Sequence, residues 1–556
     1  MSKQSGSLSE DGRTVYFAVE GHGRSDGCTE STSPAARELY ARIDGEQSDA
    51  RSVLISGPAS TGCESAECHK NTTEGANARD ANFEAASADG SRAFFTDTQQ
   101  LTDAASEDPN AESSAAATCS SIVEPGGCNL YESECPNSNR CAQPAERRLI
   151  DLSEGPGGAP VEGGPRVQGL LGISADGSHA YFVARGVLTG TEENQSHEKA
   201  EDGKENLYAY ERDEAHPGGH LAFVARLAPS DKEEWREGGI ANVTPSGRLL
   251  VFTSHRGLTG DATCVEGEGR VPVCPAQVYE YDAVTGSLVR VSVGEKGFND
   301  DGNGGAVGEE IQGHYAGDAR VVEALHGAGS VPLRLDPTMS DDGAYVFFQS
   351  PVALTPGALN DVPVGEQQFA QNVYEYHAGH VSLISDGKDT THEGGIPGSS
   401  PVELLGADTS GANVFFTTFD PLVPEDTDTL RDIYDAHICS VGEPCPPQRS
   451  TPAPCEGDAC HGSPPGQGAA QTPGSESFNG PGNLTPPPPP KGKTAAQIRA
   501  EKLAKALKTC RKDKKKAKRV KCERQAREQF GPAKKATKAK RAKKARRAAN
   551  HRRGSS

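Results

Sequence analysis

The 556-residue chain has no long apolar run, so the roughly 18 consecutive apolar residues of a membrane-spanning helix occur nowhere in it. The N-terminus lacks a charged segment followed by an apolar core, and the sequence as written therefore carries no secretory signal. No G-x-S-x-G segment is present, which removes the nucleophile elbow of many hydrolases. These absences argue against a helical membrane protein and leave no nucleophile–base set to name.

Aromatic residues make up only 5% of the chain, yet they concentrate behind one recurring phrase. The phrase is Ser or Thr, then Asp and Gly, then an apolar or aromatic run, and it begins at residues 9, 87, 174, 244, 340 and 408. The copies read SEDGRTVYF, SADGSRAFF, SADGSHAYF, TPSGRLLVF, SDDGAYVFF and DTSGANVFF. The fourth copy lacks the Asp and the sixth shifts it. Self-similarity of this kind predicts a repeat architecture.

Each copy predicts four strands. Ser, Asp and Gly together predict a turn. The Ser and Asp side chains accept hydrogen bonds from backbone N–H groups, and Gly tolerates positive φ. A short apolar stretch precedes the turn, and a buried strand follows it. A third strand carries Y-x-Y patterns such as Tyr279 and Tyr281, and a fourth follows a tight turn. We expect the paired aromatics to fill the layers between neighbouring units, and the Ser and Asp side chains to serve the turn.

The pattern S-x-D-G plus strand, [IVL]-Y-x-Y/D, then a G-x-x-x-x-[LI]-S strand resembles the WD-repeat-like propeller blades of the TolB type. The resemblance covers residues 7–438 in six passages, although the Trp-Asp ending of true WD repeats is absent and Trp235 is the only tryptophan. It implies an all-β fold, a six-bladed β-propeller of four-stranded antiparallel blades. It says little about a ligand.

The chain divides by composition into four predicted parts. Residues 1–440 form the propeller, 441–493 a disordered Pro/Gly/Ser-rich linker, 494–531 a basic helical hairpin and 532–556 a disordered polycationic tail. The first blade has only a weak first strand and the last blade has no fourth strand. We therefore expect that the natural fold begins before Met1, or that the gene is a fragment.

Charge separates the tail from the body. Residues 491–556 hold 27 Lys and Arg against 4 Asp and Glu, whereas the whole chain has a net charge of −21. A tail of this kind predicts a polyanionic partner for residues 494–556, either an anionic envelope polymer or lipid head group, or nucleic acid. Phe530 is the tail's only aromatic residue, so base stacking finds little support.

Fifteen cysteines favour an oxidising compartment, because most stand as close couples in loops. The couples are Cys63/Cys68, Cys264/Cys274, Cys439/Cys445, Cys455/Cys460 and Cys510/Cys522. Cys119, Cys128, Cys135 and Cys141 crowd one further loop with their pairing left open, and Cys28 is the odd residue. We therefore expect an extracytoplasmic protein, although its export signal is missing from the sequence as given.

Candidate cofactor sites are few. Two Cys-x4-Cys-His stretches, at 63–69 and 455–461, depart from the usual haem attachment spacing and are better explained as disulfide clips. Zinc lacks a second Cys/His couple at ligand spacing. Asp426, Asp428 and Asp432 lie in one acidic loop that offers carboxylate oxygens to calcium, without matching a helix-flanked calcium loop. No cofactor is predicted, and calcium is the alternative kept open.

The sequence thus predicts a non-enzymatic, extracytoplasmic propeller that binds a protein or an envelope polymer on its face, with a basic tail that associates with polyanions. One alternative is a calcium- or cofactor-dependent enzyme acting at the central opening of the propeller. A second alternative is a nucleic-acid-associated propeller protein.

Overall fold

A computed structural model of the chain separates it into two compact units, Met1–Ala453 and Pro454–Ser556. The structure describes residues 6–20, 36–45, 47–48, 50–58, 62–65, 68, 79–106, 128–136, 141, 146–214, 216–235, 241–261, 264–266, 272–305, 309–311, 314–321, 337–365, 368–391, 400–439, 508 and 524. The predicted linker, helical hairpin and polycationic tail lie outside the described residues, apart from Lys508 and Arg524. No described helix is long and apolar enough to span a membrane.

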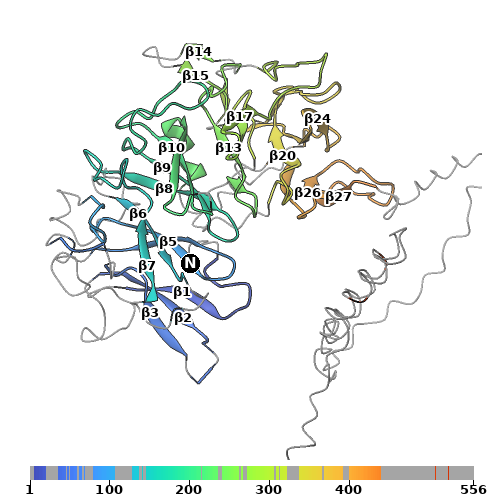
Figure 1. Ribbon diagram of the computed structural model, residues 1–556. Helices are drawn as coiled ribbons and strands as arrows, with labels where there is room; N and C mark the ends of the chain where they lie inside the picture. The colour runs from blue at the N-terminus through green and yellow to red at the C-terminus, as the bar shows by residue number, and fades with distance from the viewer. Residues whose placement is uncertain are drawn as a thin grey trace, which may run out of the picture. The chain divides into compact units, whose positions relative to one another are not determined.

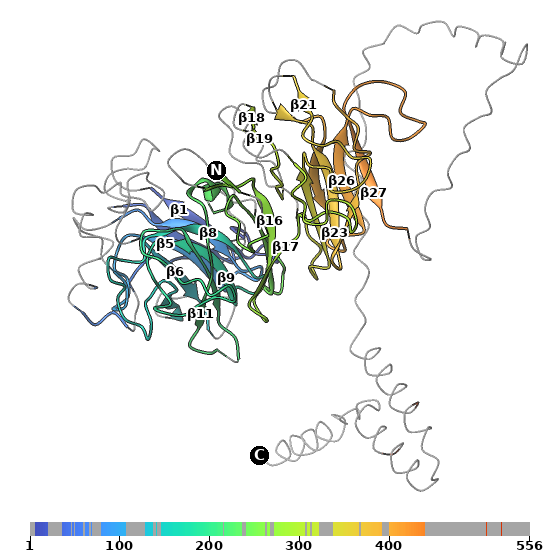
Figure 2. The same ribbon diagram turned by 90° about the horizontal axis from the view of Figure 1, so that it is seen from above.

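The described part of the first unit is built almost entirely of antiparallel strands, and six sheets of three or four strands follow one another along the chain (Figures 1 and 2). They comprise β1 (Thr14–Val19), β2 (Glu38–Ile43) and β3 (Arg51–Leu54); β4 (Asn82–Ala86), β5 (Arg92–Asp97), β6 (Asn129–Glu134) and β7 (Arg148–Asp151); β8 (Val167–Ile173), β9 (His179–Ala184), β10 (Asn206–Glu211) and β11 (His220–Arg226); β12 (Asn242–Val243), β13 (Leu249–Ser254), β16 (Gln277–Asp282) and β17 (Ser287–Arg290); β20 (Tyr345–Ser350), β23 (Asn372–His377) and β24 (His380–Leu383); and β25 (Glu403–Ala407), β26 (Asn413–Thr418) and β27 (Asp432–His437).

The connections between these strands contain several short elements. They are the two-stranded sheets β14 (Val265–Glu266) with β15 (Pro272–Val273), β18 (Glu310–Ile311) with β19 (His314–Tyr315), and β21 (Pro363–Val364) with β22 (Gln368–Phe369), and the 3-10 helix η3 (Pro229–Glu234). Each of the six larger sheets contains one copy of the repeated phrase. We number the repeats first to sixth in chain order.

The core lies between consecutive sheets rather than inside any one of them. Five hydrophobic clusters join the first repeat to the second, the second to the third, and so on to the sixth. In the fifth repeat, Phe347 packs toward the sixth repeat and its neighbour Phe348 packs toward the fourth. Side chains alternate along a strand, so two adjacent aromatics serve two different interfaces. The prediction for the paired aromatics is confirmed.

The first strands of neighbouring repeats also meet, since β8 contacts both β4 and β12, and β25 contacts β20. Three sheets have the predicted four strands: those of the second, third and fourth repeats. In the fifth repeat an isolated bridge between Met339 and Val346 stands where the first strand was expected. Among the described residues, the first repeat has only a bridge between Leu8 and Val15 before its turn, and the sixth has no strand after β27. The described parts of both end repeats therefore have fewer strands than the second, third and fourth repeats.

Candidate functional site

The Ser and Asp side chains of the repeated phrase are occupied by their own turn. Ser174 Oγ donates to Asp176 Oδ1 at 2.7 Å, and the N–H groups of Ser178 and His179 donate to Asp176 Oδ1 and Ser174 Oγ at 2.9 Å each. Burial raises the pKa of Asp176, but the hydrogen bonds from Ser174 and Ser178 outweigh it and leave the pKa below its ordinary value. The same pattern recurs at Ser9, Ser87 and Ser340. The first four residues of each phrase thus form a turn, called the corner below, and their Ser and Asp side chains are occupied by hydrogen bonds within it.

The two departing copies keep the corner by substitution. In the fourth repeat, Ser246 Oγ replaces the carboxylate and accepts the Arg248 N–H at 3.3 Å. In the sixth repeat, Asp408 Oδ1 accepts from Ser410 Oγ at 2.8 Å and from the Ala412 N–H at 3.1 Å. Asp408, at the first position of the turn, therefore accepts the hydrogen bonds that the Asp at the third position accepts in the copies that have one there.

The corners are linked to one another in chain order. The N–H of the second residue of one corner donates to the carbonyl of the second residue of the next. These bonds run from Glu10 to Ala88 at 2.8 Å, Ala88 to Ala175 at 2.7 Å, Ala175 to Pro245 at 2.8 Å and Asp341 to Thr409 at 2.8 Å. Pro245 has no N–H, which accounts for the single missing link, to Asp341. Consecutive repeats are thus related by one repeated contact geometry.

The first tyrosine of the Y-x-Y pattern clamps a loop. In the fifth repeat, Tyr374 Oη donates to the Val352 carbonyl at 2.7 Å and accepts the Leu354 N–H at 3.1 Å. Both partners lie in the loop that follows β20, at the Leu-Thr pair repeated along the sequence. Equivalent clamps are made by Tyr131, Tyr208 and Tyr279. These fully buried tyrosines are structural, because both hydrogen-bonding roles of each hydroxyl are filled.

In the sixth repeat the equivalent tyrosine, Tyr434, has a different partner, which is one of the predicted calcium residues. Tyr434 Oη still accepts the Leu422 N–H, but it donates to Asp426 instead of a carbonyl. Carboxylate oxygens of Asp426, Asp428 and Asp432 all lie within 4.8 Å of one another. The structure brings the three predicted residues together in one partly exposed group, whose oxygens are of the type that calcium prefers.

A second group was missed in the sequence. Glu211, Asp213 and His216 bring two carboxylate oxygens and one imidazole nitrogen within 4.8 Å of one another at the β10–β11 turn. His216 Nδ1 lies 3.3 Å from Asp213 Oδ1, and His179 Nε2 lies 3.4 Å from Glu211 Oε1. Mixed nitrogen and oxygen ligands suit transition metals, but ion pairing between these groups also accounts for the arrangement. The only sequence signal was the E-x-D-x-x-H spacing.

Every cysteine that the structure describes is disulfide-bonded. Cys63–Cys68, Cys135–Cys141 and Cys264–Cys274 have Cα–Cα distances of 5.5, 5.6 and 4.2 Å. Cys128 and Cys439 are also disulfide-bonded. The predicted partners Cys119, Cys445, Cys455, Cys460, Cys510 and Cys522 lie outside the described residues, as does Cys28. The structure thus chooses Cys135–Cys141 among the pairings that were open in the crowded loop.

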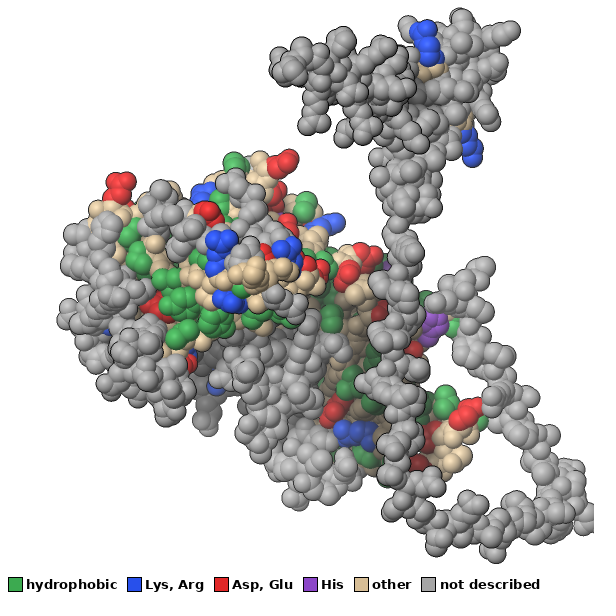
Figure 3. All heavy atoms as spheres, turned by 90° about the horizontal axis from the view of Figure 1, so that it is seen from below, with side chains coloured by type: hydrophobic (Ala, Val, Ile, Leu, Met, Phe, Trp, Pro, Cys, Tyr) green, Lys and Arg blue, Asp and Glu red, His purple; other side chains and the backbone are tan. Residues whose placement is uncertain are grey.

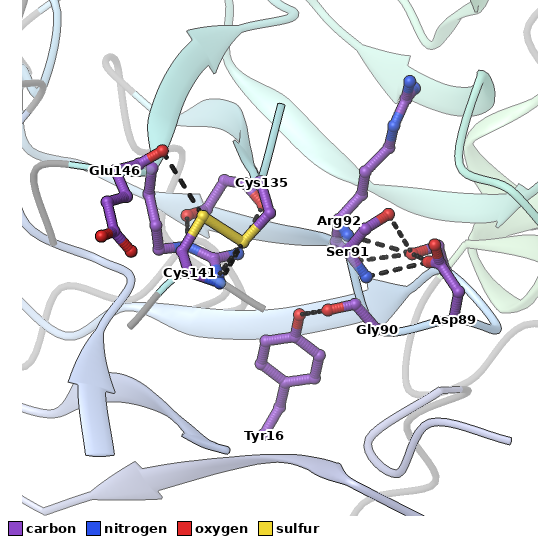
Figure 4. Close-up of a disulfide and its surroundings, with 11 residues drawn as sticks. Tyr16, Asp89, Gly90, Ser91, Arg92, Cys135, Cys141 and Glu146 are labelled. Atoms are coloured by element: carbon purple, nitrogen blue, oxygen red, sulfur yellow. Dashed lines mark hydrogen bonds between the residues drawn. A yellow bond between two sulfur atoms is a disulfide. The ribbon is translucent and has the colours of Figure 1, made fainter. Parts of the chain in front are cut away.

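Figure 4 shows where this disulfide lies. Cys141 Sγ lies 3.4 Å from the Glu146 carbonyl oxygen, and the Cys141 N–H donates to Cys135 Sγ at 2.9 Å. Nearby, Tyr16 Oη of the first repeat donates to the Gly90 carbonyl of the second repeat's corner at 2.8 Å. The disulfide therefore links the first residue after β6 to Cys141 within the β6–β7 connection, close to the junction between the first two repeats.

Comparisons with known proteins identify no family. No family description matches the sequence, and no curated protein matches it. Similar solved structures include TolB from Acinetobacter baumannii (12% identity, 73% of this chain and 60% of that chain, TM-score 0.25) and Porphyromonas gingivalis dipeptidyl peptidase 4 (12%, 74% and 41%, 0.33). Kuenenia stuttgartiensis hydrazine synthase is a third (12%, 74% and 71%, 0.24). The chain spans less than two thirds of the first two, and likenesses at these TM-scores carry no argument about this chain.

Proposed function

We propose that the chain is a non-enzymatic, extracytoplasmic binding scaffold, a six-bladed propeller whose face takes a protein or an envelope polymer and whose basic tail associates with polyanions. The observation that carries the proposal is the pairing of every described cysteine, since clipped loops suit an oxidising compartment. The Ser, Asp and Tyr side chains of the repeats support a structural role, because their polar atoms bond within the turns and loops.

The tail gives a direct test of the polyanion. We expect the full chain to sediment with phosphatidylglycerol vesicles and not with phosphatidylcholine vesicles, and a chain ending at Lys493 to lose this binding. The attraction between basic side chains and an anionic surface is screened by salt, so binding should fall as ionic strength rises.

Equal binding by the shortened chain would contradict the role of residues 494–556. Retention of double-stranded DNA at a salt concentration that releases the vesicles would favour the nucleic-acid alternative instead. A circular dichroism spectrum of the shortened chain that keeps its strand signal serves as the control for folding of the first unit.

Calcium binding is a second candidate, favoured by the grouping of Asp426, Asp428 and Asp432. We expect titration calorimetry to detect calcium binding in the full chain, and Asp428→Asn to weaken it by about tenfold or more because it removes one charged ligand. Asp435→Asn, on the same strand as Asp432 but outside the group, is the matched control. Absence of binding in the wild type, or an equal loss in the control, would reject this site.

A further inference from the structure

Two faces of the repeat array have no neighbour among the described residues. The leading face belongs to β1 of the first repeat and carries Val15 and Phe17. The trailing face belongs to β26 of the sixth repeat and carries Phe415. In every other repeat the equivalent positions lie in an interface with an adjacent repeat, so the end faces can be compared residue by residue with five complete examples.

Burial at the equivalent positions identifies the two faces. Seven residues after the start of each phrase, the side chain packs toward the following repeat, and it is at most 5% exposed in the first five repeats. Phe415 at this position is 39% exposed. Six and eight residues after the start, the side chains pack toward the preceding repeat and are at most 2% exposed in the second to sixth repeats. Val15 and Phe17 are 40% and 37% exposed.

The glycines of the corners also show that the leading face of the first repeat has no neighbouring repeat against it among the described residues. A methyl group placed on Gly90 would come within 2.9 Å of Thr14 of the preceding repeat, and one on Gly411 within 2.9 Å of Tyr345. The corner glycines of the third, fourth and fifth repeats meet the equivalent residues Arg92, His179 and Leu249. A methyl group on Gly12 meets nothing within 4 Å. The residue of the sixth repeat equivalent to these neighbours is Asn413.

The chain of backbone hydrogen bonds ends at the same two faces. The Thr409 N–H makes no backbone hydrogen bond to a described residue, and the Glu10 carbonyl accepts none from one. A bond between them would repeat the contact that Ala88 makes with Ala175 at 2.7 Å. The two end faces thus hold the two halves of an interface of the kind already present five times, four of them with the backbone hydrogen bond.

We infer that the trailing face of the sixth repeat packs on the leading face of the first repeat of the same chain. The Thr409 N–H then donates to the Glu10 carbonyl, Asn413 lies beside Gly12, and Phe415 packs on the face that carries Val15 and Phe17. Both end faces carry exposed apolar side chains, and exposed apolar patches mark interaction surfaces. Figure 3 shows one face of the protein, on which exposed hydrophobic side chains are also visible. One chain tethers both faces at a high effective concentration. Pairing between copies would instead extend head to tail without necessarily closing.

The test is hydroxyl-radical footprinting of the full chain, with its mass in solution measured in parallel. In a monomer, Phe17 and Phe415 should be modified about tenfold more slowly than the exposed Phe298 and about as slowly as the buried Phe347. Modification at the rate of Phe298 in a monomer would overturn the inference. Protection that appears only in a dimer or larger species would overturn it too, in favour of a second copy.

A pair of variants sharpens the test. Phe415→Asp places a charge in the inferred interface and should raise modification of Phe17 about tenfold, whereas Val284→Asp, at a site 74% exposed in a hairpin, should not. Protection of Phe347 checks that the variant is folded, and the wild-type result stands even where it is not. The inference rests on the proposed six-bladed arrangement, but not on the binding role: open ends with intact disulfides and vesicle binding would reject closure alone.

Discussion

Replacing Arg212 with Ala is expected to lower the unfolding free energy by about 3–5 kcal/mol, the cost of leaving buried charges without their partner. Arg212, in the third repeat, lies 3.0 Å from Glu134 of the second repeat and also pairs with Glu132, whose side chain is fully buried. Arg92 is farther away, with its nitrogens 3.6 and 3.5 Å from the two carboxylates. Loss of Arg212 therefore leaves two buried carboxylates in the interface between these repeats with only the more distant Arg92 beside them.

Hydrogen exchange of the amides in β6 and β10, combined with denaturant unfolding, measures this effect. Arg248→Ala is the matched control, because its pair with Asp282 is 55% exposed on the Arg side and exposed pairs contribute about 0–1 kcal/mol. Burial already raises the pKa of Glu132 to about 7, so the loss in Arg212→Ala should shrink near pH 5, where the Glu132 carboxyl is protonated. Equal losses in Arg212→Ala and Arg248→Ala would contradict the role assigned to the buried pair.

Replacing Glu38 with Gln is expected to stabilise the protein above pH 7 by about 3 kcal/mol and to change little below pH 4.5. Glu38 is 1% exposed, and burial raises the pKa of its carboxyl from 4.5 to about 7, against the hydrogen bond from Ser56 and with a further rise from Asp80. The folded protein therefore holds this proton at pH values where the unfolded chain has released it. Its stability falls as pH rises from 4.5 to about 7 and then levels off.

Thermal unfolding of the wild type and Glu38→Gln between pH 4.5 and 8.5 checks the sign. The two curves should coincide at the acidic end and separate as pH increases, since Gln keeps an acceptor for Ser56 without a proton to lose. Glu192→Gln, on an exposed loop, is the control and should leave the pH profile unchanged. A constant difference between wild type and Glu38→Gln across this range would show that ionisation of Glu38 is not its cause.

The sequence predicted the repeats because their signals are local. A Ser-x-Asp-Gly turn and two adjacent aromatics such as Phe347 and Phe348 lie within nine residues, and alternation alone sends the two rings to opposite interfaces. The prediction of short end repeats rests on local signals too, since the sequence around each end lacks the pattern of one strand. The three aspartates of the sixth repeat also stood close enough in sequence to be grouped.

What the sequence did not predict depends on contacts across longer separations. The Tyr374 hydroxyl reaches a carbonyl 22 residues earlier, in a loop whose residues vary between repeats. His179 lies beside Glu211 of the second group only because β9 and β10 are paired. The Arg212 cluster joins residues about 80 positions apart. The crowded cysteines could not be assigned because their pairing depends on how the loop after β6 folds back.

Disulfide mapping of protein taken from its native compartment, alkylated before any reductant is added, tests the proposed extracytoplasmic scaffold most directly. The account predicts linked peptides for Cys63–Cys68, Cys135–Cys141 and Cys264–Cys274, with no alkylation at these six positions. Free, alkylated thiols at these positions would contradict it, because a reducing compartment would then hold the protein.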